Sequence, residues 1–176
     1  MKKTILRFGT LGAICIAVIF FLSWIIARPE SGNYDQQEII GYASIILSML
    51  FVFLGIKYYR DKVNNGHISF LQGLKLGILI VLFPSLAFAA IDIIWVLVLD
   101  PNFAEKYYAH EAEKLRASLS ASELQVKLKE MEAQKEMFSN PAIGFVVMFM
   151  TVFIIGLIVT VISALILKRS PAAARA

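Results

Sequence analysis

The chain has 176 residues, which is room for one domain, and 59% of its residues are hydrophobic. A soluble domain is typically about 45–50% apolar even with glycine counted, so this excess excludes an ordinary soluble fold and indicates a lipid bilayer. The net charge of +4 divides between the two expected membrane faces, so no nucleic-acid partner is expected. Cys15 is the single cysteine, which excludes an internal disulfide.

The first apolar run, residues 8–27, follows Lys2, Lys3 and Arg7, an arrangement that signal peptides also have. The run has about 20 residues, whereas the apolar region of a signal peptide usually has about 7–15. Arg28, Pro29 and Glu30 come next, without a cleavage site built from small residues. We therefore interpret the run as a retained transmembrane helix.

Three further apolar runs cover residues 39–56, 74–99 and 142–167. A helix needs roughly 20 residues to cross the hydrocarbon core, so each run is long enough to span it. Ser69 with Gln72 forms a capping box, which predicts that the third helix begins at about Phe70. Pro84 removes one backbone hydrogen bond inside this helix and predicts a bend. Residues 1–169 thus form a single transmembrane domain, and we expect 170–176 to be a disordered tail.

The segment 101–139, between the third and fourth runs, is long and charged. Phe103 and Tyr107 share one helical face with later leucines, and Ser120 with Glu123 repeats the capping-box pattern. The segment is therefore predicted to form two short helices with a break near residues 118–122. The expected fold is all-α: an integral membrane four-helix bundle with a short extracytoplasmic helical hairpin between helices three and four.

The charges predict the orientation. Four spans place both termini on one side, and that side carries ten basic residues and one acid, Asp61. The opposite side carries seven basic and eleven acidic residues. Cytoplasmic loops are enriched in Lys and Arg, so both termini are expected in the cytoplasm.

Asp92 is the only acidic residue inside an apolar run. A charged side chain in the membrane costs several kcal/mol, so an intramembrane acid is a functional candidate by default. Asp92 lies only about seven residues, or roughly 10 Å, from the outer end of its helix. It can therefore snorkel, be protonated or hydrogen-bond a hydroxyl on a neighbouring helix, and these structural alternatives compete with a transport or proton-relay role.

Small residues recur at four-residue spacing in all four runs and indicate close helix packing. They are Gly9, Ala13 and Ala17, then Ser44 and Ser48, then Gly73 and Gly77, and finally Gly156, Thr160 and Ala164. His67 and His110 are predicted on opposite membrane faces, so they cannot share a metal, and His110 is expected to be a solvated surface residue. No metal-ligand cluster, phosphate loop or catalytic triad is recognisable, so no cofactor, metal site or enzymatic activity is expected.

The segment 55–73 is the most distinctive part of the chain. Physically it is a tight cytoplasmic turn, in which Asn65 and Gly66 tolerate positive φ and Ser69 caps the next helix. It also resembles the bacterial family called domain of unknown function 4199, whose pattern is Phe-x-Gly-Ile, then Tyr-Arg-Asp, then Asn-Gly-x-Ile-Ser-Phe. The matching residues here are Phe53, Gly55, Ile56, Tyr59, Arg60, Asp61, Asn65, Gly66, Ile68, Ser69 and Phe70.

A second similarity to this family covers residues 156–169, near the closing helix. The family often has a proline shortly before Gly156, where this chain has Ile154 and Ile155, which puts a proline-dependent bend in doubt. The resemblance covers nearly the whole chain and implies four spans in a bacterial cytoplasmic (inner) membrane. It implies no activity.

Two functions from different classes fit these patterns. The first is a non-enzymatic subunit or accessory protein that acts through helix contacts, as a homo-oligomer or with another membrane protein in the bilayer. The second is a small oligomeric transporter or channel that uses Asp92, Pro84 and intramembrane hydroxyls such as those of Ser85 and Thr151. A transporter usually needs several converging polar groups, and the apolar runs contain one acid.

Overall fold

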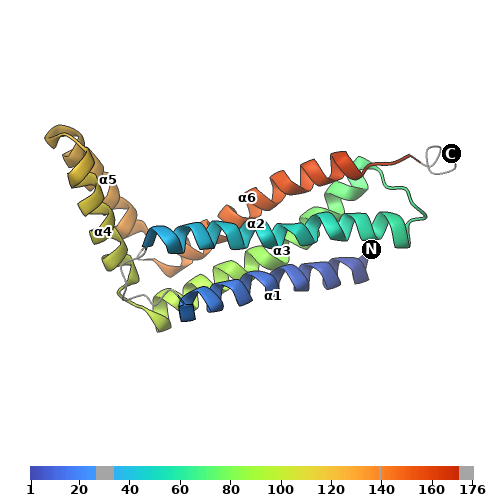
Figure 1. The fold of residues 1–176 in the computed structure, drawn as a ribbon, viewed down its shortest axis with the longest axis horizontal. Helices are drawn as coiled ribbons and strands as arrows, with labels where there is room; N and C mark the ends of the chain where they lie inside the picture. The colour runs from blue at the N-terminus through green and yellow to red at the C-terminus, as the bar shows by residue number, and fades with distance from the viewer. Residues whose placement is uncertain (27–33, 139, 171–176) are drawn as a thin grey trace.

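The computed structural model of this chain describes residues 1–26, 34–138 and 140–170. Six α-helices form within them and no β-strand: α1 (Lys2–Ile26), α2 (Tyr34–Tyr58), α3 (Phe70–Ile94), α4 (Phe103–Ser118), α5 (Ala121–Phe138) and α6 (Pro141–Leu167) (Figure 1). Helix α2 continues into a π-helical turn at Tyr59–Val63, and α3 into one at Trp95–Leu99. The predicted all-α class is confirmed. The segment 28–30 and, from residue 171 onward, the expected tail lie outside the described residues.

Four of the described helices are long and apolar enough to cross a membrane. They are Lys2–Ser23, Tyr34–Val63, Phe70–Leu99 and Pro141–Leu167. Large apolar side chains point outward along them, including Ile46, Ile158 and Ile166, which are 60%, 56% and 66% exposed. Many exposed large apolar side chains along four such helices are costly in water but suit lipid, so the chain is a multi-pass membrane protein.

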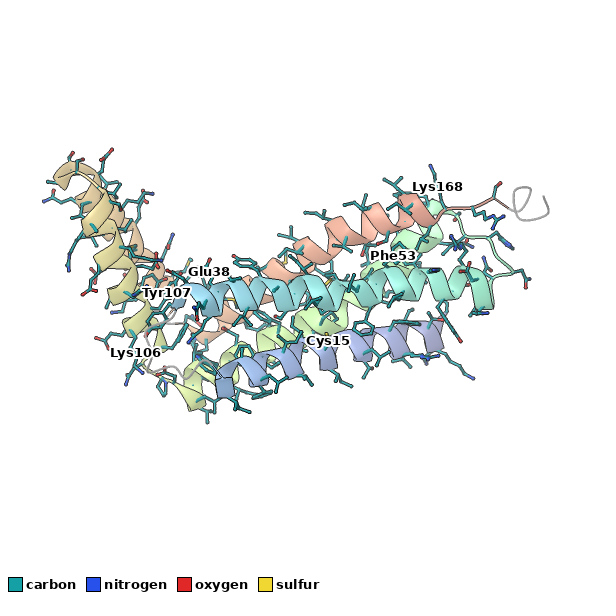
Figure 2. All side chains as sticks on the ribbon, in the orientation of Figure 1. Cys15, Glu38, Phe53, Lys106, Tyr107 and Lys168 are labelled. Atoms are coloured by element: carbon teal, nitrogen blue, oxygen red, sulfur yellow. The ribbon has the colours of Figure 1, made fainter. Side chains whose placement is uncertain are left out.

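The helices are arranged so that α3 contacts α1, α2 and α6. The start of α1 and the end of α6 lie at one end of the bundle, here called the near end, and α4 and α5 lie at the other, the far end (Figure 1). Figure 2 places Lys168 at the near end and Glu38 and Tyr107 at the far end. The chain runs along the bundle four times, an even number, so the start of α1 and the end of α6 lie at the same end.

Small residues bring α3 and α6 together in the half of the bundle toward the near end. A Cβ atom added at Gly77 would lie 2.4 Å from Thr160 Cγ2, and one at Gly73 would lie 3.2 Å from Ala164 Cβ. Farther along, one at Gly156 would lie 2.5 Å from Val81 Cγ1. The predicted packing role of these small residues is therefore confirmed, and it operates within a single chain.

Candidate functional site

The family-motif residues build the turn between α2 and α3 at the near end. Asn65 and Gly66 have φ values of 52° and 80°, as expected for a turn that needs the left-handed region. The Ser69 hydroxyl accepts from Gln72 N–H, and the Gln72 side chain accepts from Ser69 N–H, so α3 begins at Phe70 with the predicted capping box.

This turn is joined to the end of α6. Ile68 and Arg169 exchange two backbone hydrogen bonds, of 3.1 and 2.9 Å. The Arg60 guanidinium donates to the Leu167 carbonyl at 3.4 Å and is held by the Asp61 carboxylate at 2.6 Å. These bonds fasten α2, α3 and α6 together at the near end.

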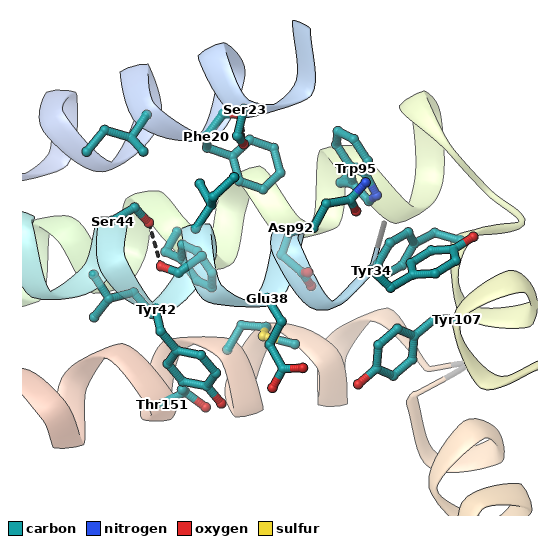
Figure 3. Close-up of a pocket in the computed structure, with 18 residues that line it drawn as sticks. Phe20, Ser23, Tyr34, Glu38, Tyr42, Ser44, Asp92, Trp95, Tyr107 and Thr151 are labelled. Atoms are coloured by element: carbon teal, nitrogen blue, oxygen red, sulfur yellow. Dashed lines mark hydrogen bonds between the residues drawn. The ribbon is translucent and has the colours of Figure 1, made fainter. Parts of the chain in front are cut away.

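Asp92 lies in a different environment, a cavity of about 260 Å³ in the far half of the bundle (Figure 3). Side chains from α1, α2, α3, α4 and α6 line it. Its charged members are Asp92 on α3 and Glu38 on α2, and its wall contains no lysine or arginine among the described residues. The cavity is therefore acidic. The exposed Glu38 and Tyr42 connect it with the surface of α2.

The Asp92 carboxylate is half-buried, yet none of the residues that the structure describes gives it a hydrogen bond or an ion pair. Among the alternatives considered from sequence, a hydrogen bond to a neighbouring hydroxyl is thus not observed. The three serine and threonine hydroxyls that line the cavity are bonded elsewhere, and the phenols of Tyr34, Tyr42 and Tyr107 line it as well. Ser23 donates to the Phe20 carbonyl at 2.7 Å, Ser44 to Gly41 at 2.6 Å and Thr151 to Val147 at 2.9 Å. Each hydroxyl proton is used within its own helix, which leaves oxygen lone pairs for any cavity occupant.

Aromatic rings form the far wall of the cavity. The Trp95 ring lies 5.2 Å from that of Phe20 and 6.1 Å from that of Phe103, and the Tyr34 ring lies 6.1 Å from Phe103 and from Tyr107. These rings come from four helical segments and attach α4 to the bundle. Burial, followed by the nearby Glu111 and Glu38 carboxylates, raises the pKa of Tyr107 above its ordinary 10.0, so the phenol stays neutral.

A second polar cluster joins α2 to α4 outside the cavity. Asp35, His110 and Glu111 have ligand atoms within 4.8 Å of one another, a combination that can hold a metal ion. Lys114 occupies the centre of this cluster, because its ammonium bonds both the Asp35 and the Glu111 carboxylates. Those two bonds raise the pKa of Lys114 above its ordinary 10.5, so the lysine remains a cation and competes with any metal. As described, the cluster works as an ion-pair network.

Two features of this end were not anticipated from sequence. His110 is half-buried beside Tyr34, with ring centroids 5.1 Å apart, so the expectation of a solvated His110 is wrong. Sequence reasoning missed Glu38, which lines the same cavity as Asp92, because the two acids lie on different helices. The aromatic residues around 95–107 were the available signal, since such rings at a membrane boundary accompany polar sites as well as lipid headgroups.

Comparison with known proteins shows the family of this chain. The family described as "Protein of unknown function (DUF4199)" matches residues 7–169. No curated protein and no solved structure matches.

Proposed function

The chain belongs to the DUF4199 family of proteins of unknown function, and from that premise we propose that it is a non-enzymatic, multi-pass protein of the bacterial inner membrane that binds a small solute in the far-half cavity. The observation that carries this proposal is the cavity itself, which is lined by the half-buried carboxylate of Asp92, a group that none of the described residues bonds. Burying an ionisable group without a partner is costly, and functional sites are where such costs are found.

A transport role is the simplest use of such a site. Asp92 lies in a membrane span, and intramembrane acids commonly mark solute or proton pathways. The small residues give less support to the alternative role as a helix-packing subunit. Gly73 and Gly77 on α3 face α6, and Gly156 on α6 faces α3, so these contacts lie within one chain. These small residues are already packed against the chain's own helices, so they offer no surface for a partner helix.

Tryptophan fluorescence can test the proposal directly. Trp24→Phe leaves Trp95, which lines the cavity, as the single tryptophan. We expect a saturable change in Trp95 emission with at least one member of a panel of small cations, anions and neutral solutes. Gly41→Phe should abolish it, because Gly41 lines the cavity with nothing within 4 Å of an added Cβ. The matched control is Ile46→Phe, which adds a ring to the lipid-facing side of the same helix and should leave the signal intact. No response to any solute would contradict the proposal.

A partner-binding role is the second candidate, and the surface of α4 and α5 favours it. Neither helix has a buried residue, and Val126 and Met137 on α5 are 58% and 44% exposed. If this surface binds a membrane-protein partner, cross-linking in native membranes should capture a stoichiometric complex that Val126→Glu disrupts. An unchanged complex in that variant would exclude α5 as the contact surface.

The proposal places the near end in the cytoplasm and α4 and α5 outside, on the strength of the positive-inside count. Cysteine labelling in a Cys15→Ala background tests this orientation. Ser122→Cys on α5 should react with an impermeant reagent in intact cells, whereas Asn65→Cys in the turn should react only after permeabilisation. The reverse pattern would invert the topology.

A further inference from the structure

We infer that the cavity selects a small organic cation, an ammonium ion with an apolar body, and this inference rests on the solute-binding function proposed above. Two acids, Asp92 and Glu38, contribute to one cavity from different helices. Neither carboxylate has a salt-bridge partner among the described residues. An occupant with a positive charge would supply the partner that both acids lack.

The three serine and threonine hydroxyls of the lining agree with a cationic occupant. Ser23, Ser44 and Thr151 give their protons to carbonyls of their own helices, so they present lone pairs toward the cavity. The lining has no lysine or arginine among the described residues, so an anionic solute would meet two carboxylates with no basic residue to offset them. A phosphate-bearing lipid headgroup is disfavoured for the same reason, and an organic ammonium ion that is not part of a lipid is favoured.

The aromatic wall adds a reason for an organic cation rather than a metal ion. Trp95 and Tyr107 line the cavity and are joined through Phe103, whose ring is stacked on that of Tyr107 at 6.0 Å. Faces of aromatic rings attract ammonium groups, most strongly quaternary ones surrounded by several rings. A small alkali or divalent ion would instead require a close shell of oxygen ligands.

The size of the cavity limits the ligand. Its volume of about 260 Å³ lies below the ~300–1,000 Å³ of pockets that hold drug-sized molecules. Choline, a quaternary ammonium ion with one hydroxyl, is a suitable probe. Its neutral analogue, in which carbon replaces nitrogen, has the same shape without the charge, and phosphocholine adds the phosphate of a lipid headgroup.

The experiment measures the affinity of the three probes by Trp95 fluorescence in the Trp24→Phe protein. We expect choline to bind at least about tenfold more tightly than its neutral analogue and than phosphocholine. Asp92→Asn should weaken choline binding by about tenfold or more and leave the neutral analogue unchanged. Glu38→Gln should have a smaller effect of the same kind, because Glu38 is exposed, and it provides the test if Asp92→Asn does not fold.

The outcomes separate the two levels of the proposal. Equal binding of choline and the neutral analogue, or choline binding that survives both substitutions, would overturn the cation inference and leave solute binding in place. If phosphocholine bound as tightly as choline, the inferred occupant would be a lipid headgroup and not a free organic cation. Absence of binding by every probe and every member of the wider panel would overturn both proposals.

Discussion

The two halves of the bundle use the same helices differently. Toward the near end, α3 and α6 approach through Gly73, where an added Cβ atom would be tight, and Gly77, where there is no room for one. Toward the far end, the same two helices contribute to the wall of a cavity, with Asp92 on α3 and Thr151 on α6. Gly41, which also lines the cavity, has nothing within 4 Å of an added Cβ.

This difference separates a tightly packed half from the half that holds the proposed binding cavity, along the length of one helix pair. In a membrane, helix association depends on close packing and interhelical hydrogen bonds, because lipid tails are as apolar as the side chains. The near half supplies that packing, and the motif turn fastens it. The far half can then hold open space and an acid that none of the described residues bonds, because the packing of the near half holds the helices together.

The largest expected effect comes from filling the near-half contact. Gly77→Val should lower the free energy of unfolding by about 3 kcal/mol, the upper part of the range for overpacking, because the new Cβ meets the stiff, β-branched Thr160. The matched control is Gly41→Ala, which adds a methyl group to open space and should leave stability unchanged or slightly raised. The measurement is the melting temperature of each variant in detergent. Equal losses of stability in the two variants would show that the two halves do not differ in how tightly their helices pack.

The next effect is expected at the motif turn. Gly66 has a φ of 80° with open space around it, so Gly66→Val introduces backbone strain without a clash. The cost should be about 1–2 kcal/mol, the lower part of the range for strained backbone. Val63→Ala is the control, since Val63 is 47% exposed and its truncation should be mild. Equal melting temperatures for the two variants would show that the turn does not need the left-handed conformation.

The fold was largely predictable because its signals are local. The four spans follow from continuous apolar runs, the start of α3 from Ser69 and Gln72, and the break between α4 and α5 from the Ser120 region. The observed break covers residues 119–120, inside the predicted interval. These features depend on neighbouring residues and on the length of a helix that crosses a bilayer.

The candidate site was only half predictable because it depends on contacts between helices. Asp92 was identified from its position in an apolar run, but nothing in one sequence places Glu38 or Tyr107 beside it. The surface pairs show the same limit, since Lys114 reaches Asp35 from a helix far along the chain. Such pairings are set by how helices dock, which periodicity does not specify.

A smaller effect on stability is expected at Asp92 itself. Because no described residue bonds its carboxylate, neither Asp92→Asn nor Asp92→Leu should break a protein hydrogen bond. We expect both variants to insert and fold with stability changes no larger than the ~0.6 kcal/mol average of an intramembrane hydrogen bond. Detergent melting beside liposome flux of choline is the measurement. Normal melting with lost flux in Asp92→Asn supports the solute-binding role, whereas a large melting loss in both variants would make Asp92 a structural residue of the far half.

The smallest effect is expected where α5 begins, beyond the cavity. Glu123 accepts from the Ser120 hydroxyl at 2.5 Å and from the Ser120 N–H at 3.2 Å, and the pKa of this carboxyl is lowered from its ordinary 4.5 by those bonds. A lowered folded-state pKa means that the contribution to stability is complete above the ordinary value and is lost as pH falls through the folded value. Ser120→Ala should therefore return the Glu123 pKa part of the way toward 4.5, since the backbone bond remains. Carboxyl NMR titration measures this, with Ser118→Ala as the control because Ser118 bonds the Lys114 carbonyl instead. Because the group is fully exposed, this contribution is confined to the start of α5 and is too small to move the melting temperature of the bundle measurably. A melting temperature that followed the Glu123 pKa would show that α5 is coupled to the near half.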